Sequence, residues 1–368
     1  MKCSVVFDAP NIGREEKTSL VRIINTGYVS TAGHCVAEFE EKFAGYFGIK
    51  KSVAVQSGTA AIHIALCELG IGPGDEVIVP VMTFVATVNP IIYNYAKPVF
   101  VDVDPATWNI DSCAIENHIS KKTNAILPVH LYGNPCAMDR ILSIARKHKL
   151  YVIEDAAESL GATYKGRYTG IFGDIGCFSF NGNKIITTGS GGMVVGQNAK
   201  RLQHIKFLVN QAKDPKNSFF HPEVGYNYRM TNLQAALGLA QMDKLNDFLA
   251  KKRNFNKLYR KYLSTIDGIA FQENLPTAES SWWLTGIVLN KTKDITRIQR
   301  KLMEQGIPTR RNFMPITDFP AYKKYKKGRY PQAQYIYKHG LCLPGSTLNS
   351  FKNIEHVCQI LKKVVSKN

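Results

Sequence analysis

Short apolar runs alternate with segments of helical pattern between about residues 50 and 200 of this 368-residue chain, and this alternation limits the possible fold most strongly. Strand-like runs stand at 76–80, 98–102, 125–129 and 151–154, and helix-length segments such as 139–148 separate them. Strands that alternate with helices in this way form a mostly parallel, buried sheet. We therefore predict an α/β fold, whose central sheet the strand-like runs at 175–180 and 192–195 would complete or edge.

A long amphipathic stretch follows from about residue 233 to residue 263, with apolar residues at helical spacing and no proline. We expect one long helix here, of the kind that bridges two domains or borders an interface. A strand-like run at 283–289 and helical segments at 296–305 and 354–365 come after it. The chain is therefore predicted to have a large domain, residues 1–245, and a smaller C-terminal α+β domain, residues 246–368.

The composition is that of a soluble, folded protein. Hydrophobic residues make up 45% of the chain, and no apolar run approaches the roughly 18 residues that a membrane-spanning helix needs. The first residues lack the apolar run of about 7–15 residues that is typical of a signal peptide. The eight cysteines stand singly, without a Cys-x-x-Cys pair, so we expect neither a metal site nor a disulfide framework. These features predict a cytoplasmic protein that does not enter a membrane.

A formal net charge of +18 is compatible with nucleic acid, an anionic membrane or a phosphate-rich small molecule. The positive residues are spread along the chain, and their densest cluster, at 323–329, has the pattern of an exposed loop. The sequence contains no ordered basic stripe and no known nucleic-acid motif. We therefore expect a solvated basic surface and no nucleic-acid partner, while a phosphate-bearing substrate stays compatible with the charge.

Two segments have the composition of a ligand site. Ser57 is a good N-cap, and Gly58 and Thr59 would place free N–H groups and a hydroxyl at the N-terminus of the following helix. Such a terminus can bind a phosphate, although Ser-Gly-Thr also serves simply to cap a helix. Asp155 ends a strand-like run, at the position where open α/β sheets bind ligands. Its carboxylate could hold the proton of a pyridine ring, or it could cap the next helix.

A lysine in unusual surroundings forms the third signal. Lys184 lies in an uncharged, glycine-rich stretch, 176–192, where a lysine can lose its proton more readily, as Schiff-base chemistry requires. A surface lysine on a flexible loop is the alternative. Ser179, five residues earlier, could donate to the same phosphate as Gly58 and Thr59.

The fourth signal is the loop just before the amphipathic stretch. Thr231 or Asn232 fits the role of N-cap for that helix. Asn227 and Arg229 precede it on the loop, from which they could reach a neighbouring site.

The order and spacing of these segments resemble one known family. Lys184 follows Asp155 by 29 positions, and a Phe-Ser-Phe run at 178–180 precedes it. The pattern resembles the DegT/DnrJ/StrS sugar aminotransferases, a branch of the aspartate-aminotransferase fold (fold type I) whose members use pyridoxal 5'-phosphate (PLP). The resemblance extends from about residue 26 to the C-terminal helix. It implies an enzyme with an aspartate-aminotransferase-like large domain and a small C-terminal domain.

The resemblance implies a role for each matched residue. Lys184 matches the lysine that holds PLP as a Schiff base and moves the proton during amino transfer. Asp155 matches the residue that is paired with the ring nitrogen. Gly58, Thr59 and Ser179 match the cup that holds the cofactor phosphate.

Further positions complete the site that the resemblance implies. Phe84 matches the aromatic residue that stacks on the cofactor ring, and Glu158 falls where the family often has Gln, Glu or His near the ring hydroxyl. Asn227 matches the residue that reaches the cofactor phosphate of the neighbouring subunit, which implies a homodimer with shared active sites. Arg229 and Arg310 are candidates for the diphosphate of a nucleotide substrate, with a surface or interface position as the alternative for each.

Within the family, the runs at 128–133, 183–189 and 225–232 resemble enzymes that aminate carbon 4 of nucleotide-linked 4-keto-6-deoxy sugars, the perosamine-forming group of O-antigen and lipopolysaccharide biosynthesis. This resemblance implies glutamate as the amino donor. Aminotransferases of the legionaminic-acid pathway share many of these stretches, so a UDP- or dTDP-linked sugar and amination at carbon 3 stay open. The segments 280–283 and 309–312 depart from the family pattern, which leaves the identity of the sugar open.

Two rival functions share the fold. A dehydratase of this family would carry histidine in place of Lys184. A non-catalytic regulator would need no intact pair of Lys184 and Asp155, and a half-reaction with glutamate would separate it from an enzyme.

Overall fold

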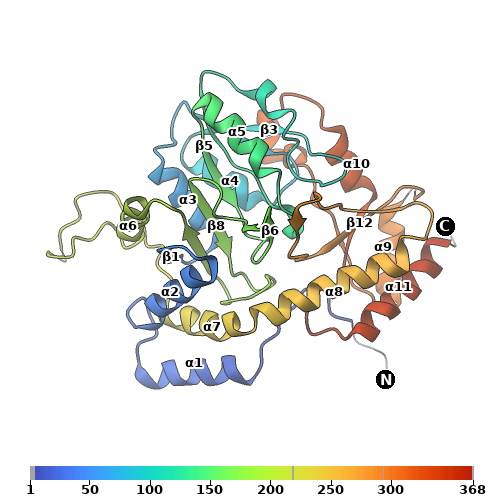
Figure 1. The fold of residues 1–368 in the computed structure, drawn as a ribbon, viewed down its shortest axis with the longest axis horizontal. Coiled ribbons are helices and arrows are strands. Elements are labelled where there is room, and N and C mark those ends of the chain that lie inside the picture. The colour runs from blue at the N-terminus through green and yellow to red at the C-terminus, as the bar shows by residue number, and fades with distance from the viewer. Residues whose placement is uncertain (1–4, 218, 293, 367–368) are drawn as a thin grey trace.

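A seven-stranded sheet forms the centre of the structure, a computed structural model that describes residues 5–217, 219–292 and 294–366 (Figure 1). Its strands lie in the order β1 (Ser52–Val55), β9 (Gly192–Val195), β8 (Ile175–Ser179), β5 (Tyr151–Asp155), β4 (Thr123–Ile126), β2 (Glu76–Pro80) and β3 (Lys97–Val101). Every pairing is parallel except the two that β9 makes. The predicted α/β fold with a mostly parallel central sheet is confirmed.

The predicted strands correspond to β2, β3, β4, β5, β8 and β9, with small differences at their ends. The largest difference is in β4, which was expected to run to Val129 and ends at Ile126. Pro128 has no N–H to donate to a neighbouring strand, and Val129 pairs with Asp155 only through an isolated bridge. The strands β8 and β9 lie inside the sheet, and β1, which was not predicted, forms the edge beside β9.

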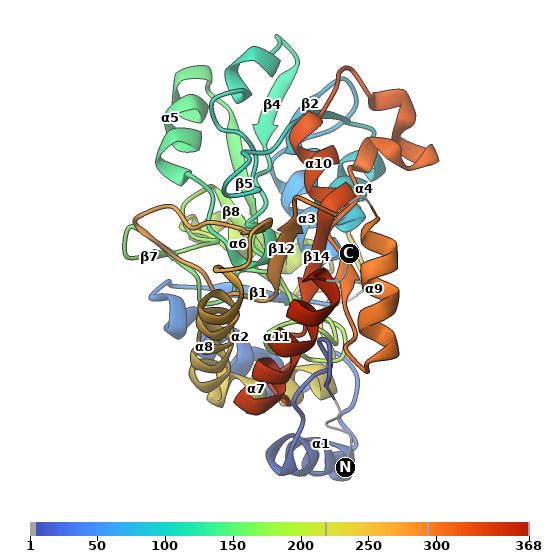
Figure 2. The same cartoon turned by 90° about the vertical axis from the view of Figure 1, so that its right-hand side faces the viewer.

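Helices cover both faces of the sheet, as Figures 1 and 2 show. They are α1 (Arg14–Thr26), α2 (Cys35–Phe47), α3 (Gly58–Glu68), α4 (Val85–Tyr93), α5 (Met138–His148) and α6 (Ala199–Leu208). The predicted helix at 139–148 is α5, which shares an apolar cluster with Ile78 of β2. Val77 and Val79, the neighbours of Ile78, belong to the cluster that includes α3 and α4. Alternate residues of β2 therefore face two apolar layers, as expected for a strand that is buried on both sides.

The long helix predicted from 233 to 263 is wrong in one respect, because the structure divides it. A first helix, α7 (Asn232–Asp243), ends at Lys244, and a second, α8 (Leu245–Leu263), begins directly after it. The Lys244 ammonium lies 2.8 Å from carboxylate oxygens of both Glu15 and Glu16 in α1, and these contacts hold the junction. Of the two N-cap candidates, Thr231 is the cap, because its Oγ1 accepts a hydrogen bond from the N–H of Gln234.

The C-terminal part contains a second sheet (Figure 2). Its antiparallel strands lie in the order β10 (Ile269–Phe271), β12 (Thr285–Leu289), β14 (Gly340–Leu343) and β13 (Arg310–Arg311). Its helices are α9 (Ile295–Glu304), α10 (Pro331–His339) and α11 (Phe351–Ser366). The predicted strand at 283–289 and helices at 296–305 and 354–365 correspond to β12, α9 and α11, and this part is α+β as expected.

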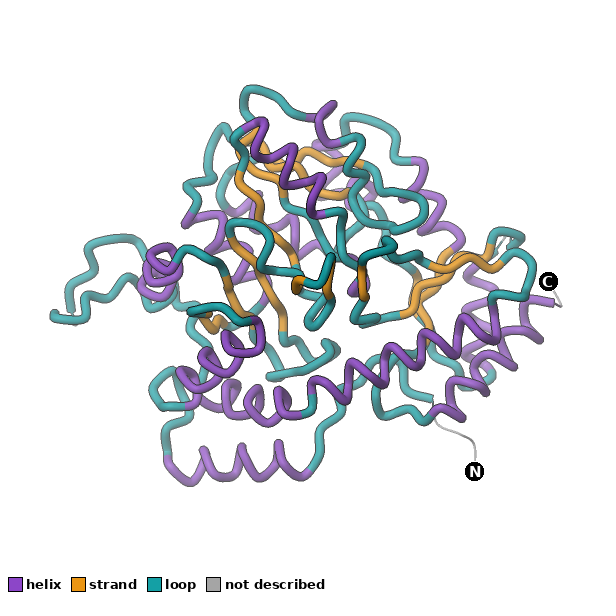
Figure 3. Tube along the Cα trace, viewed as in Figure 1, coloured by secondary structure: helices purple, strands orange, loops and turns teal. Residues whose placement is uncertain are grey.

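Short elements complete the chain, and Figure 3 distinguishes them from the loops by colour. A small three-stranded sheet consists of β11 (Ala278–Glu279), β6 (Thr163–Tyr164) and β7 (Arg167–Tyr168). The 3-10 helices are η1 (Ile115–His118), η2 (Leu131–Gly133), η3 (Ile316–Asp318) and η4 (Pro320–Tyr325).

Two apolar cores involve residues from both sides of position 245. The main core, around the central sheet, includes Phe248 of α8 and Trp283. The second core, between β12, β14, α9 and α11, includes Val5 from the N-terminal segment. Val6 binds Asn349 through two hydrogen bonds of 2.9 and 2.7 Å. The division into domains 1–245 and 246–368 therefore stays a proposal, and the junction of α7 and α8 is the place where it would fall.

Seven cysteines lie in the described part of the chain and all have free thiols, while Cys3 lies outside the described residues. Among the helices of the described ranges, none combines the length and the apolar character that a membrane crossing requires.

Candidate active site

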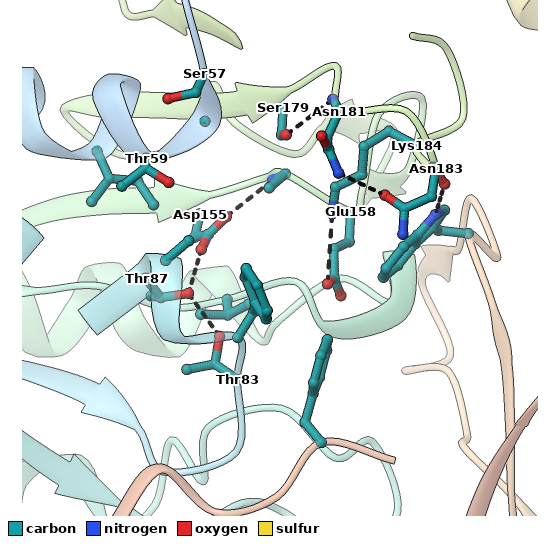
Figure 4. A pocket seen from close by; sticks show the side chains of 18 of the residues that line it. Ser57, Thr59, Thr83, Thr87, Asp155, Glu158, Ser179, Asn181, Asn183 and Lys184 are labelled. Carbon is teal, nitrogen blue, oxygen red and sulfur yellow. Dashed lines mark hydrogen bonds and ion pairs between the residues drawn. The ribbon is translucent and has the colours of Figure 1, made fainter. Parts of the chain in front are cut away.

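A pocket of about 290 Å³ opens at the carboxyl ends of the parallel strands (Figure 4). The central sheet contributes residues that follow or end β1, β2, β4, β5 and β8, and the C-terminal part contributes the far wall. The lining of the pocket includes Gly58, Thr59, Phe84, Thr87, Asp155, Glu158, Ser179, Asn183, Lys184, Trp283, Arg310 and Phe313. The end of a parallel sheet is the usual ligand position in such folds.

The N-terminus of α3 forms one side of the pocket. Ser57 caps the helix, since its Oγ accepts a hydrogen bond of 3.1 Å from the N–H of Ala60. The first-turn N–H groups of Gly58 and Thr59 have no acceptor within the helix, and both residues line the pocket. A side chain at position 58 would meet the Cβ of Ser179 at 2.8 Å. Both predicted roles of this segment, helix cap and anion site, are therefore compatible with the geometry.

Asp155 ends β5 with its carboxylate buried at the floor of the pocket. Its Oδ2 accepts a hydrogen bond of 2.7 Å from Thr87, and its Oδ1 accepts one of 3.1 Å from the N–H of Ala157. Burial raises the pKa of Asp155, although these hydrogen bonds and the charge of Lys184 lower it. Turns, and no helix, follow β5. The alternative that Asp155 caps the next helix is therefore wrong.

Lys184 projects from the loop after β8 into the pocket, and its side chain is only 14% exposed. The alternative of a surface lysine is therefore wrong. Its Nζ lies 3.8 Å from Glu158 Oε1 and 4.1 Å from the centre of the Trp283 ring. Burial lowers the pKa of Lys184, while the charges of Glu158 and Asp155 raise it. An amine that loses its proton more readily is suited to forming a Schiff base.

Glu158 is buried beside Lys184 and accepts a hydrogen bond of 2.7 Å from the N–H of Tyr132. Burial raises the pKa of Glu158, and the Lys184 charge lowers it. Phe84 stands at the opposite wall, where it is 55% exposed although it is a large aromatic residue. Its ring centre lies 6.1 Å from that of Phe313. An aromatic ring that is exposed inside a pocket offers one face to a flat ligand.

The predicted substrate and partner residues lie in different places. Arg310 lines the pocket, with Nη1 3.6 Å from the carboxylate of Asp8 and with Nη2 buried without a hydrogen-bond acceptor among the described residues. Arg229 and Asn227 lie outside this pocket. Arg229 donates to the side chain of Asn210 over 3.3 Å, and Asn227 pairs with Asn210 through a backbone bridge.

Sequence reasoning missed several residues of the pocket. Thr83 and Thr87 form a chain of hydroxyls to Asp155, with a hydrogen bond of 2.7 Å between them. Their spacing of four at the predicted start of a helix could have indicated it. Trp283, Phe313 and the nearby Asp8 come from distant parts of the chain, and no local pattern marks them.

A buried lysine and a buried carboxylate at the ends of parallel strands, beside a helix N-terminus, form the kind of site that holds a phosphorylated aldehyde cofactor. The comparisons with known proteins give the same class. The family model of the DegT/DnrJ/EryC1/StrS aminotransferases matches residues 10–362. The chain belongs to this family of PLP-dependent sugar aminotransferases, which makes it an enzyme with PLP as its cofactor.

Individual relatives are similar over nearly their whole length. The chain is 39% identical to a GDP-perosamine synthase of Caulobacter vibrioides, over 97% of each chain. It is 35% identical to a GDP-perosamine synthase of Vibrio cholerae, over 96% of this chain and 97% of the relative. A Streptococcus pneumoniae protein classed as a sugar aminotransferase, solved in its PLP form, superposes with a TM-score of 0.94 at 28% identity, over 99% of each chain. The fold is therefore that of the type I PLP aminotransferases, as the sequence predicted.

The pocket fits this cofactor on its own chemistry. Asp155 is a buried acid whose two partners, Thr87 and the N–H of Ala157, are both uncharged, so a protonated ring nitrogen would provide the missing cation. The free N–H groups of Gly58 and Thr59 suit a phosphate, and the exposed ring of Phe84 suits a flat ring.

Proposed function

We propose that the enzyme transfers an amino group from glutamate to carbon 4 of a nucleotide-linked 4-keto-6-deoxy sugar, as GDP-perosamine synthases do, during surface-glycan biosynthesis in the cytoplasm. The observation that carries this proposal is the 39% identity to a GDP-perosamine synthase over 97% of both chains. The pocket supports it, because a lysine of lowered pKa stands beside two buried carboxylates.

Four residues of the pocket have a proposed task in this reaction. When bound, PLP supplies an electron sink for the carbanion that forms at the amino carbon. Asp155 would hold the ring nitrogen and favour its protonated form, and Phe84 would stack on the ring. Lys184 would hold the cofactor through its aldehyde, and its free amine would take the proton from the amino carbon and return it, as general base and then general acid. Glu158 faces the Lys184 amine and orients it through the 3.8 Å ion pair.

The anionic parts of the substrates need cations. Arg310 is the proposed partner in the same chain, because its Nη2 is buried at the pocket wall without an acceptor among the described residues. Arg229 and Asn227 lie outside the pocket of their own chain. We propose that they serve a second copy, with Asn227 at the cofactor phosphate of the partner, in a homodimer with shared active sites.

The decisive experiment incubates the PLP-loaded enzyme with glutamate and GDP-, UDP- and dTDP-linked 4-keto-6-deoxy sugars in parallel. Mass spectrometry of the sugar nucleotide detects the amine, and fragmentation locates it at carbon 4 or carbon 3. The proposal expects the GDP-linked sugar to react fastest and to carry the amine at carbon 4. Preferred amination of a UDP- or dTDP-linked sugar, or amination at carbon 3, would contradict this proposal. It would favour the alternative, an aminotransferase similar to those of the legionaminic-acid pathway. Absence of any half-reaction with glutamate would favour a non-catalytic regulator.

A further inference from the structure

The N-terminal segment lies against the C-terminal part of the chain and reaches residues of the active site. Residues 5–9 run along the C-terminal part, where the carbonyl of Phe7 accepts hydrogen bonds from the N–H groups of Gly345 and Ser346, at 2.7 and 2.9 Å. The carbonyl of Ala9 accepts another, at 2.7 Å, from Ser346 Oγ. These contacts, with the pair formed by Val6 and Asn349, fix the backbone on both sides of Asp8.

Asp8 thereby places a carboxylate at the rim of the pocket, with its side chain only 19% exposed. Its Oδ2 accepts a hydrogen bond of 2.9 Å from Asn183 Nδ2 and lies 3.6 Å from Arg310 Nη1. One carboxylate therefore contacts both the residue that directly precedes Lys184 and Arg310, which also lines the pocket.

Asn183 is held from three sides. Asp8 binds the side-chain N–H, Asn181 donates to the side-chain oxygen over 3.2 Å, and the indole of Trp283 donates to the backbone carbonyl over 2.6 Å. The same Trp283 ring lies 4.1 Å from the Nζ of Lys184. Asn183, which directly precedes Lys184, is therefore held by Asp8 at its side chain and by Trp283 at its backbone.

We propose that Asp8 is a positioning residue of this active site, which acts on Lys184 by holding Asn183 and which balances the charge of Arg310. The proposal rests on the proposed function, because it assumes that Lys184 is the cofactor lysine.

The charges around Lys184 make the proposal measurable. The charged groups that face its amine are Glu158, Asp155, Arg310 and Asp8. Burial lowers the pKa of Lys184, Arg310 lowers it further, and the three carboxylates raise it. Loss of the Asp8 charge therefore shifts the balance toward the unprotonated nitrogen.

The test measures the visible absorbance of the PLP-loaded enzyme against pH, without substrate, in wild type, Asp8→Asn and Asp8→Ala. Asp8→Asn can still accept the hydrogen bond of Asn183 but carries no charge. We expect it to shift the absorbance midpoint to lower pH by about half a unit. Asp8→Ala also loses the hold on Asn183, so we expect the same shift and about tenfold weaker PLP binding, as one lost charge-assisted hydrogen bond would give. Asp247→Asn removes an exposed carboxylate of α8 and is the matched control, with no shift expected.

A second variant separates positioning from general damage. Asn183→Ala alone should weaken PLP binding as Asp8→Ala does. The double variant should weaken it little further, because both substitutions remove the same contact between Asp8 and Asn183. Thermal unfolding identifies variants that fail to fold. Where Asp8→Ala does not fold, the pH midpoint of the absorbance in Asp8→Asn decides whether the proposal holds. An absorbance midpoint in Asp8→Asn equal to that of wild type, or fully additive losses in the double variant, would overturn the proposal. A wild-type enzyme that forms no visible absorbance with PLP would instead overturn the proposed function, and this inference with it.

Discussion

Burial moves the pKa values of Lys184 and Glu158 toward each other. It lowers the pKa of the amine and raises that of the carboxyl, and the two groups lie 3.8 Å apart. A pair of this kind exchanges protons at a smaller cost in free energy than an exposed pair, whose pKa values lie about six units apart. Since the reaction asks Lys184 to take a proton and give it back, the proximity of Glu158 suits the proposed role.

Replacement of Lys184 tests the assignment directly. Lys184→Ala leaves no amine to join the cofactor, so we expect the absorbance band of the lysine imine to disappear and amino transfer to fall by about three orders of magnitude or more. Absorbance spectra and the half-reaction with glutamate measure both effects. Lys121→Ala, at an exposed position, is the control. A Lys184→Ala enzyme that turned over at the wild-type rate would show that another residue carries the chemistry.

Phe84 makes a smaller and separate contribution. Its ring is 55% exposed within the pocket, and stacking on a flat ring contributes about 0.5–1.5 kcal/mol. Phe84→Ala should therefore weaken PLP binding by about two- to tenfold. Fluorescence titration of the cofactor-free protein measures this affinity, with Phe351→Ala, a partly exposed aromatic residue of α11, as the control. Unchanged affinity in Phe84→Ala would remove the stacking role.

At the scale of elements, the sequence predicted what depends on local pattern. The buried parallel strands are continuous apolar runs, and their order along the chain with helices between them implied the sheet. The edge strand β1 and the break at Lys244 were both missed. The ion pairs of Lys244 at this break are made with Glu15 and Glu16 of α1, which is distant in sequence. A helical pattern records which face is buried, but it does not show where contacts with a distant helix accompany a break in the axis.

In the active site, too, local pattern predicted some residues and missed those that tertiary packing brings in. Asp155, Lys184 and the N-terminus of α3 were predicted to belong to one site, because their order and spacing along the chain resemble those of one aminotransferase family. The structure brings them together in one pocket. Trp283 lines the pocket and Asp8 contacts two of its lining residues, Asn183 and Arg310, through tertiary packing, and neither has a local pattern that could have marked it.

The junction between α7 and α8 has a testable anchor in Glu16. Burial raises the pKa of Glu16, but hydrogen bonds from Lys244, from the N–H of Gly13 and from Gln241 outweigh it and lower the pKa from 4.5 to about 2. A carboxyl whose pKa is lowered in the folded state stabilises that state above its unfolded pKa. This contribution is lost as the pH falls from about 4.5 to about 2.

Glu16→Gln should therefore lower the free energy of unfolding at pH 7 by at most about 3 kcal/mol. The difference in free energy of unfolding between this variant and wild type should shrink as the pH falls below about 4.5. Urea unfolding at several pH values measures this. Glu15→Gln is a matched control, because Glu15 contacts the same Lys244 from a position where its side chain is 65% exposed. A Glu16→Gln protein with wild-type stability at pH 7 would show that the junction does not need this carboxylate.

At the scale of the whole molecule, two features of the chain have no explanation within a single subunit. Asn227 and Arg229 do not line the pocket that contains Lys184. The loop before them extends away from the body of the protein in Figure 1, and its apolar residues Phe219 and Val224 are 95% and 85% exposed. Both features suit the proposed homodimer, in which this loop would pack against the second copy.

Mixing two inactive variants tests this homodimer and its shared site together. If Asn227 completes the partner's pocket, Lys184→Ala and Asn227→Ala damage different subunits of the same site. A heterodimer of the two then contains one site with both residues intact and one site with neither. Since random mixing places half of the chains in such dimers, co-refolded variants should recover about a quarter of wild-type activity. Lys184→Ala mixed with Asp155→Ala is the control, because both residues belong to one chain's site and no dimer restores them. Equal inactivity of the two mixtures would show that Asn227 serves its own subunit or no active site.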